Sequence, residues 1–482
     1  MKDYVKLIER LVRIPNETTW FEFKHNCYDP EMIGERISGL ANSATLEDRA
    51  CGYMIWGIHD KTHEVVGTDK DLQSIKVGTE ELEGWLRQRL SRNADFQFDV
   101  VYIGGKRVGI LTISAAVGYP VSFQKNDYIR FGSINRKLNE FAEKRGQLWD
   151  KLRMSKFETR VAKDELSAAD VVALLDCQAY FDLKKVPYPT TQEGVIHYFQ
   201  EEGLIVRQDN GLYAVTNLGA TLFSKRMSSF ASIARKAVRV VKYKGENKLE
   251  IEKEGTIDKG YAVGFEELVK CICVLATTAE PIILALREPN LPYPVIALRE
   301  IIANALIHQD LTITGVGPLI EIFSNRIEVT NPGAPLVDIL RIVDTPPKSR
   351  NEKLAALMRM LNMCEEAGSG WDKIVISCEV MNLPAPKVSS YEESTKVTLF
   401  SKIPFARLTG ESKLWACYLH ACVKQVQEDQ LTNNSLRKRF GLSESSAGVI
   451  SRLIRDAVEK QLIKPFDLEA SRKYMRYIPI WS

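Results

Sequence analysis

The amino-acid sequence lacks several features that would assign a function at once. Its nine cysteines include no CxxC pair, and none of its glycines belongs to a GxxxxGK[ST] loop. A zinc ribbon and a Walker-type phosphate loop are therefore not expected. No segment approaches the length of a membrane span, and the first residues contain no apolar signal region. Together with the scattered thiols, these absences predict a cytoplasmic protein without membrane contact.

The net charge is also too small to indicate a partner. The chain holds 65 basic and 62 acidic residues among 482. Any affinity for nucleic acid must therefore come from local patches of charge. The apolar share of 45% is enough to build hydrophobic cores. The length predicts about three domains.

The pattern of apolar residues divides the chain into four parts. Short helices and strands alternate in residues 1–155, and helices followed by a small hairpin suggest a winged-helix-like connector in 156–235. An α/β pattern returns in 236–408. Residues 409–482 contain a helix, a turn, a second helix and two short strands, which is typical of a winged helix-turn-helix. The expected fold class is α+β with several domains.

The most specific spacing lies in VIALREIIANALIHQD, residues 295–310. Glu300, Asn304 and His308 follow one another at intervals of four and so share one face of the predicted helix. An amide oxygen can ligate Mg²⁺, and a neighbouring carboxylate can orient or deprotonate a water molecule. The spacing predicts a nucleotide site, although it also fits an ordinary exposed polar face.

Three segments in order, ExxxNA, IEVTNPGAPL and RNEKLAALMRMLNMCEEAGSGWDKI, resemble the nucleotide-binding domain of the GHKL ATPases, and most closely the divergent branch fused to Schlafen-type domains. The resemblance implies that the domain binds ATP with Mg²⁺ in a Bergerat-like α/β sandwich. Glu300 would be the catalytic acid/base and Asn304 the metal ligand. Gly333 would lie near the adenine, and Gly368, Ser369 and Gly370 would form a phosphate-facing loop at a helix start.

One position departs from the GHKL pattern. The family usually reads the adenine amino group with an aspartate in a DxGxG turn, and Asn331 stands there in this chain. Its carbonyl oxygen can still accept that hydrogen bond. Both sensing and hydrolysis of ATP therefore stay open.

The first part of the chain carries a second resemblance. WFEFK, ISGLANSA, GYMIWGIHD and YIRFGS, within residues 5–140, resemble the AlbA_2 domain shared with Schlafen proteins. The resemblance implies a three-carboxylate nuclease site at Glu17, Glu22 and Asp60. Carboxylates of this kind can hold Mg²⁺ or Mn²⁺ ions that activate water against a phosphodiester. Lys24 shares a strand face with Glu22 and would neutralise the phosphate.

Basic residues are expected to contact nucleic acid in two places. Arg130 and Lys137 would bind backbone phosphates in the Schlafen-like part. Residues 431–482 contain ten Lys or Arg against five Asp or Glu, so the C-terminal module is locally basic. Its predicted contacts are Lys438, Arg439, Arg452, Arg455, Arg472 and Lys473. The same module also suits protein contacts or a homo-oligomer.

These features lead to two main hypotheses. The first is an ATP-gated, metal-dependent nuclease that cuts RNA such as tRNA, or single-stranded DNA, in defence against phage. The second is an ATP-binding, DNA-binding regulator that cleaves no phosphodiester. A third hypothesis makes ATP hydrolysis the main activity. The sequence alone does not choose between RNA and DNA.

Overall fold

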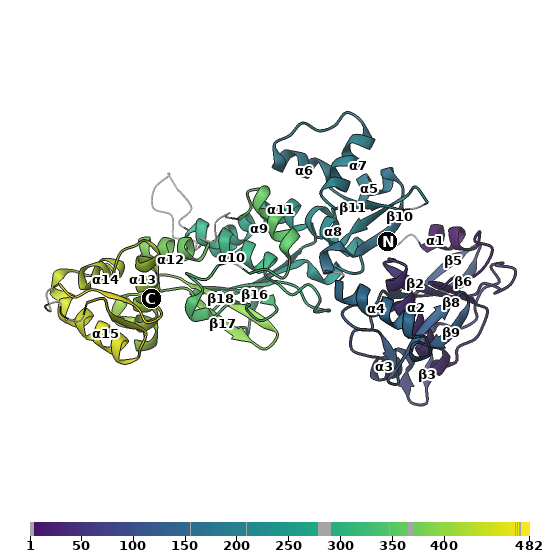
Figure 1. Ribbon diagram of the computed structural model, residues 1–482, viewed down its shortest axis with the longest axis horizontal. Helices are drawn as coiled ribbons and strands as arrows, with labels where there is room; N and C mark the ends of the chain where they lie inside the picture. The colour runs from purple at the N-terminus through teal and green to yellow at the C-terminus, as the bar shows by residue number, and fades with distance from the viewer. Residues whose placement is uncertain are drawn as a thin grey trace. The chain divides into compact units, whose positions relative to one another are not determined.

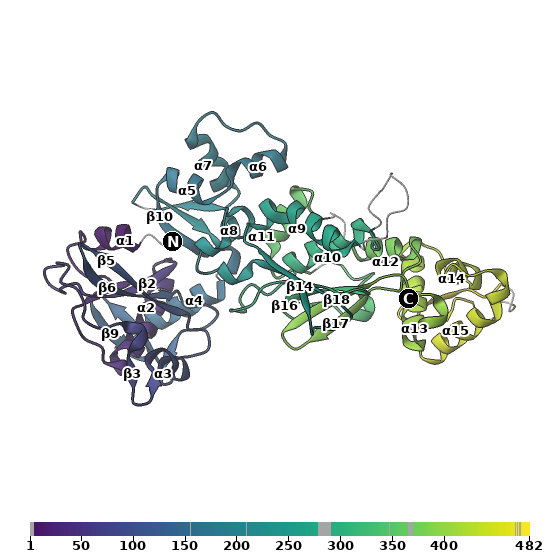
Figure 2. The same ribbon diagram turned by 180° about the vertical axis from the view of Figure 1, so that it is seen from behind.

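The computed structural model describes most of the chain. The described residues are 4–154, 156–208, 210–277, 291–346, 348–364, 370–467, 469, 471 and 474–482. They fold into two compact units, one formed by residues 1–177 and 188–235, the other by 178–187 and 236–482. Both units combine helices with small sheets, so the fold is mixed α+β (Figures 1 and 2). None of the described helices is long and apolar enough to cross a membrane.

The first unit contains a four-stranded sheet in the order β1-β2-β6-β5. Strands β1 and β2 are parallel and are connected by helix α2 (Pro30–Leu46), whereas the other pairs are antiparallel. The helix begins where the Asp29 side chain accepts backbone hydrogen bonds from Glu31 and Met32. The strand bounds are β1 Phe21–Lys24, β2 Cys51–Trp56, β5 Phe96–Ile103 and β6 Lys106–Ser114.

Alternation along β1 separates the two faces of this sheet. Phe21 and Phe23 are fully buried in an apolar cluster that includes Ile110. Glu22 and Lys24 point to the other face because successive strand side chains alternate. The local sequence thus fixes which face carries the charged residues.

Helix α2 also holds strand β8 (Asn126–Phe131) close to the sheet. Asn42 Nδ2 donates to the carbonyl oxygen of Tyr128, 2.8 Å away, and Ser43 Oγ accepts from the backbone amide of Arg130 at 3.0 Å. Short polar side chains on α2 therefore set the position of β8. The hydrogen bond from the Arg130 amide to Ser43 also fixes the position from which the Arg130 side chain extends.

The remaining elements of the first unit fall into two groups. Around the four-stranded sheet lie α1 Tyr4–Leu11, β3 Lys76–Val77, β4 Glu80–Glu81, α3 Leu82–Arg89, β7 Ser122–Phe123, β9 Ile134–Lys137 and α4 Ala142–Met154. A three-stranded sheet follows in the order β10-β12-β11. Its elements are β10 Val161–Leu166, α5 Ala168–Leu174, α7 Gln192–Glu201, β11 Ile205–Arg207, β12 Tyr213–Thr216 and α8 Asn217–Phe223. Helix α6, Cys177–Lys184, is assigned to the second unit except for its first residue.

The second unit is built on a six-stranded sheet in the order β14-β13-β15-β16-β18-β17. Only β13 and β15 pair in parallel among these strands. Helices α9, α10 and α12 lie on the same side of the sheet in both views (Figures 1 and 2). The bounds are β13 Val238–Tyr243, β14 Ile251–Ile257, α9 Tyr261–Ala276, α10 Val295–Ile307, β15 Leu319–Ile322, β16 Arg326–Pro332, α11 Glu352–Met360, α12 Gly370–Val380, β17 Lys387–Tyr391 and β18 Ser394–Phe400.

Three helices and a small hairpin form the C-terminal module of this unit. They are α13 Gly410–Val426, α14 Asn433–Arg439, α15 Ala447–Glu459 and the antiparallel strands β19 Ile463–Pro465 and β20 Tyr477–Pro479. The apolar core of the module also contains Val343, Val375 and Ala385, which precede it in the chain. The C-terminal module and the six-stranded sheet region therefore share one hydrophobic core.

Candidate functional site

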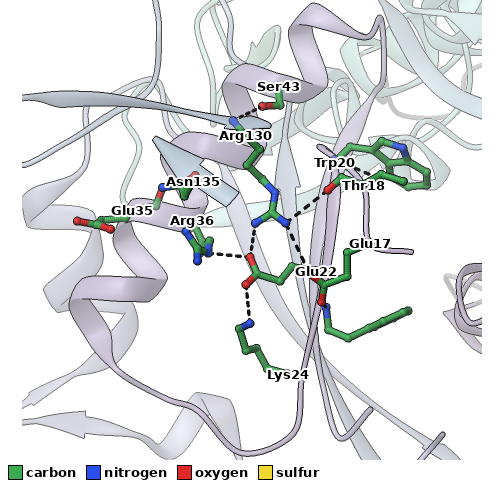
Figure 3. Close-up of polar contacts among 11 residues, drawn as sticks. Glu17, Thr18, Trp20, Glu22, Lys24, Glu35, Arg36, Ser43, Arg130 and Asn135 are labelled. Carbon is green, nitrogen blue, oxygen red and sulfur yellow. Dashed lines mark hydrogen bonds and ion pairs between the residues drawn. The ribbon is translucent and has the colours of Figure 1, made fainter. Parts of the chain in front are cut away.

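Glu22 lies at the centre of a buried cluster of charges in the first unit (Figure 3). Its Oε1 is 2.6 Å from Lys24 Nζ, and its Oε2 is 2.8 Å from Arg36 Nε of α2. Arg130 Nη1 also donates to Oε2. Burial raises the pKa of Glu22, but the charges of Arg130, Arg36 and Lys24 outweigh it, so the pKa is lowered. Both carboxylate oxygens are thus held by cations.

Glu17 completes this cluster, which we call the Glu22 cluster: Glu17, Glu22, Lys24, Arg36 and Arg130. Its Oε1 accepts a hydrogen bond from the Phe23 amide at 2.8 Å, and its Oε2 is 3.8 Å from Arg130 Nη2. Burial raises the pKa of Glu17, and the negative charge of Glu22 adds to this shift. The cluster therefore contains three cations against two carboxyl groups.

Asp60 differs from Glu17 and Glu22 in its exposure to solvent. It lies in an exposed turn after β2, with 56% of its side chain accessible, beside His59. Within the part of the chain that the structure describes, no three His, Cys, Asp or Glu side chains gather into a group that could hold a metal. The structure thus does not assemble Glu17, Glu22 and Asp60 as a metal site, and a catalytic role for them stays a prediction.

Arg130 does not lie on the open surface, where a contact with backbone phosphates was expected. Its side chain is completely buried and pairs with Glu22, so a role in phosphate binding stays a prediction. Arg36, which no sequence motif marks as a site residue, is a further partner of that carboxylate. Lys137, in contrast, is exposed on β9 as a phosphate contact requires.

A pocket of about 300 Å³ in the second unit gathers the polar residues of α10. Glu300, Asn304 and His308 all line it. Asn304 Nδ2 lies 3.4 Å from Glu300 Oε1, as one turn of helix allows. Burial lowers the pKa of His308, and the nearby charges of Arg350 and Arg359 lower it further. The imidazole is therefore neutral at physiological pH.

The first residue of α12 closes this pocket against Glu300. A Cβ atom at Gly370 would lie only 2.1 Å from Glu300 Oε1, so a larger residue at this position would displace that carboxylate. Gly370 and Trp371 line the pocket from the N-terminal end of α12, where free backbone amides favour an anion. Gly368 and Ser369, expected in the same loop, lie outside the described residues.

Asn331 lines the pocket from β16, opposite Thr395 of β18 in the sheet register. Gly333 lies behind it in a turn with a φ of +100°, and a Cβ atom at this position would lie only 2.9 Å from Asp310 Cβ. Both the conformation and the lack of space require glycine. Thr395 Oγ1 donates to the Gly333 carbonyl at 2.7 Å. Gly333 thus shapes the turn that presents Asn331.

Two residues that the sequence analysis did not single out hold α10 to this turn. Asn351 Nδ2 donates to the carbonyl oxygens of Ile307 and Gln309, each at 2.8 Å. Arg350 Nη2 donates to the Ala334 carbonyl at 2.7 Å, just beyond Gly333. The last carbonyls of a helix have no partner within it. Asn351 satisfies that of Ile307, and Arg350 Nη1 donates to the carbonyl of His308, which caps α10, at 3.3 Å.

The predicted contacts of the C-terminal module divide by exposure. Lys438, Arg452 and Arg455 are exposed on α14 and α15. Arg439 is buried with its Nε 3.6 Å from Glu379 Oε1, so it is not exposed as the expected contact with nucleic acid would require. Arg472 and Lys473 lie outside the described residues.

Two protein-family models match the chain. The Schlafen AlbA_2 model matches residues 17–139, and HATPase_c_4, described as "Putative ATP-dependent DNA helicase recG C-terminal", matches residues 315–399. The chain contains a Schlafen AlbA_2 domain and a GHKL-like ATPase domain. This confirms the resemblances read from the sequence. The two domains indicate a nucleic-acid-related function associated with ATP.

The two matches differ in how many of the candidate site residues they contain. The Schlafen AlbA_2 match contains the whole Glu22 cluster. The HATPase_c_4 match contains Asn331, Gly370 and Thr395 but begins after α10, which carries Glu300 and Asn304.

No curated protein matches the chain. Among solved structures, the DIP2311 protein from Corynebacterium diphtheriae matches 98% of this chain and 99% of its own, at 14% identity and a TM-score of 0.39. A score of this size does not establish a shared fold.

Glu22→Gln is expected to destabilise the first unit by about 3–5 kcal/mol at pH 7, because it leaves the buried Arg130 and the half-buried Lys24 and Arg36 without their counter-charge. The lowered pKa of Glu22 means that its stabilisation is present above its unfolded value of 4.5 and is lost as the pH falls through the folded value. The difference from wild type, measured by urea unfolding, should therefore shrink below about pH 4.5. Glu9→Gln, at an exposed position in α1, is the control; equal stability of wild type and Glu22→Gln at pH 7 would contradict the account.

Gly370→Ala is expected to leave the fold intact, because the clash falls on the end of the flexible Glu300 side chain. The displaced carboxylate should weaken nucleotide binding about tenfold, a change of about 1.4 kcal/mol. Titration calorimetry with a non-hydrolysable ATP analogue and Mg²⁺ measures it. Gly410→Ala, which has open space around its Cβ position, should bind as wild type. Unchanged affinity of Gly370→Ala would show that Glu300 does not need this placement.

Proposed function

We propose that the protein is an ATP-responsive regulator that binds nucleic acid through its Schlafen domain and its C-terminal module. The observation that carries the proposal is the placement of α12. The helix begins at the nucleotide pocket and its other end is held by buried polar contacts of the C-terminal module. This favours a protein in which nucleotide binding regulates the C-terminal module, while the Glu22 cluster argues against cleavage.

The chemistry of the pocket suits a nucleoside triphosphate. Its apolar lining can cover a base, and its cations can meet phosphates. The apolar group comprises Leu336, Val337, Val388 and Val397, and the cationic group Lys348, Arg350 and Arg359. Asn304 and Glu300 offer the hard oxygen atoms that Mg²⁺ prefers. Bound Mg²⁺ would neutralise phosphate charge, and Glu300 would orient a water molecule.

Glu379, near the end of α12, forms the first connection to the C-terminal module. Its Oε2 is 2.9 Å from His420 Nδ1 of α13, and its Oε1 is 3.6 Å from Arg439 Nε of α14. His420 Nε2 in turn lies 3.1 Å from Ser435 Oγ. All three interactions are largely buried, so they resist rotation of the module relative to α12. A shift of α12 would therefore move α13 and α14.

The segment between β16 and α11 forms a second connection. Leu336, Ile342 and Thr345 of this segment line the pocket. Between them, the carbonyl of Leu340 accepts a hydrogen bond from the Tyr418 hydroxyl of α13. A nucleotide that moves this wall of the pocket would also displace α13, the helix that Glu379 of α12 contacts through His420. Coupling of two sites needs such an element with differential contacts in the two states.

The C-terminal module offers a surface for nucleic acid. Arg452 and Arg455 are exposed on α15, and Lys438 is exposed on α14. Three helices followed by a two-stranded hairpin are compatible with a winged helix, whose second helix enters the major groove. We assign phosphate contacts to these three cations. The module would then couple nucleotide state to affinity for nucleic acid.

Cleavage by Glu17, Glu22 and Asp60 is the second candidate function. The Glu22 cluster argues against it, because a metal ion would have to compete with Lys24, Arg36 and Arg130 for the same carboxylate. Asp60 is the informative residue for a test. Its exposed side chain can be changed without disturbing the buried cluster.

Asp60→Asn distinguishes the two candidates without a folding defect. We expect no Mn²⁺-dependent cleavage of labelled tRNA or single-stranded DNA by wild type, with a mobility shift of the same probes in both forms. Glu64→Gln, exposed in the same loop, is the matched control. The opposite result would be cleavage by wild type and by Glu64→Gln but not by Asp60→Asn. It would overturn the proposal of a regulator without cleavage and support a nuclease.

Tyr418→Phe tests the connection between the pocket and the C-terminal module. The change removes the hydroxyl that bonds Leu340 and Trp481 but keeps the ring in the core. ATP should still bind with wild-type affinity, while its effect on oligonucleotide affinity, measured by fluorescence anisotropy, should fall about threefold, or about 0.6 kcal/mol. Tyr119→Phe, at an exposed position in the first unit, should behave as wild type. If ATP changes the oligonucleotide affinity of Tyr418→Phe as much as that of wild type, the Tyr418 hydroxyl does not couple the pocket to the C-terminal module.

A further inference from the structure

A second cavity, of about 330 Å³, lies in the first unit beside the Glu22 cluster. It is lined by the segment before β1, the end of α2, strand β8 and helix α4. Its residues are Thr19, Ser43, Leu46, Glu47, Ile129, Arg130, Lys144, Gln147, Asp150 and Lys151. Helix α4 lies beyond residue 139, where the Schlafen AlbA_2 match ends. The cavity therefore includes residues that lie outside the family match.

The residues that line this cavity are buried at its floor and exposed at its rim. Ser43, Ile129 and Arg130 are buried and form the floor. Glu47, Gln147 and Asp150 are exposed, and the other lining residues are half-buried between floor and rim.

The floor of the cavity is positively charged. Arg130 belongs to the Glu22 cluster, whose three cations exceed its two carboxyl groups by one formal charge. Among the described residues, Arg130 Nε is a buried donor without a hydrogen-bond partner. A buried donor without a partner is unfavourable, so an anion next to this wall would be stabilised.

Two lysines of α4 line the cavity, and one of them, Lys144, adds to this positive potential. Lys151 is fixed, since its Nζ donates to the Leu46 carbonyl at 2.6 Å and pairs with Asp48. Lys144 makes no ion pair with any residue that the structure describes. Its ammonium group is therefore available to an anion in the cavity.

The rim of the cavity favours a ligand that carries hydrogen-bond donors. Glu47 and Asp150 carry negative charge and would repel a free, highly charged anion such as a triphosphate. They can accept hydrogen bonds from a base amino group or a ribose hydroxyl. Leu46 and Ile129 provide an apolar wall for the face of a base. One phosphate with an attached nucleoside fits this combination better than phosphate alone.

We propose that this cavity binds one nucleotide unit of a nucleic acid, with its phosphate against the wall formed by Arg130 and Lys144 and its sugar or base at Glu47 and Gln147. The inference rests on the proposed binding of nucleic acid by the Schlafen domain and gives that binding a specific location. Phosphate binding beside Arg130 would also balance the excess positive charge of the Glu22 cluster.

Lys144→Glu is the direct test, with Arg145→Glu as the matched control. Both substitutions reverse one charge on α4, but Arg145 is exposed and does not line the cavity. We expect Lys144→Glu to weaken binding of a fluorescein-labelled single-stranded oligonucleotide about tenfold and to reduce the salt dependence by about one phosphate contact. Arg145→Glu should change the affinity less than about twofold. Gln147→Trp, which narrows the rim without a change of charge, should also weaken binding.

Competition identifies the ligand class. Each nucleoside 5′-monophosphate should displace the oligonucleotide from wild type better than inorganic phosphate does at equal ionic strength. Equal displacement by inorganic phosphate would overturn the nucleotide assignment. Equal effects of Lys144→Glu and Arg145→Glu would overturn the cavity as the site, while the proposed function would still stand on the wild-type binding. Absence of any oligonucleotide binding by wild type would overturn both.

Discussion

The contacts of the Glu379 carboxylate are the constraint on which the arrangement of the second unit depends. One oxygen faces His420 of α13 and the other faces Arg439 of α14, so α12 is tied to two helices of the C-terminal module at once. Loss of one partner from a buried ion pair typically costs about 3–5 kcal/mol, so these helices are not free to separate. Because the same helix begins beside Glu300, the state of the pocket and the position of the module share one rigid element.

The Glu22 cluster shows how a carboxylate in a nuclease-like position can serve another purpose. Three cations hold Glu22, and burial of the group makes their removal unfavourable. Such a cluster fixes strand β1, helix α2 and strand β8 relative to one another. It also leaves an excess of positive charge inside the domain, next to a cavity. We interpret the cluster as a scaffold for phosphate binding and not as a metal site.

The sequence predicted what depends on local spacing. Glu300, Asn304 and His308 meet at one pocket because their intervals follow the helical repeat. Partners from distant segments could not be found in this way. Arg36 and Asn351 carry no local signal, since their roles depend on Glu22 and on the end of α10, respectively. Burial was misjudged for the same reason: Arg130 and Arg439 belong to basic stretches, yet each is buried against a carboxylate that only the fold brings near.

Hydrogen exchange of the whole chain, followed by mass spectrometry, tests the central claim most directly. Addition of a non-hydrolysable ATP analogue with Mg²⁺ should slow exchange in α10 and α12, and equally in α13 and α14, because Glu379 and Tyr418 join them. Asn304→Ala, which removes the proposed metal ligand, should abolish both effects. Protection confined to α10, with α13 and α14 exchanging as in the nucleotide-free protein, would contradict the coupling.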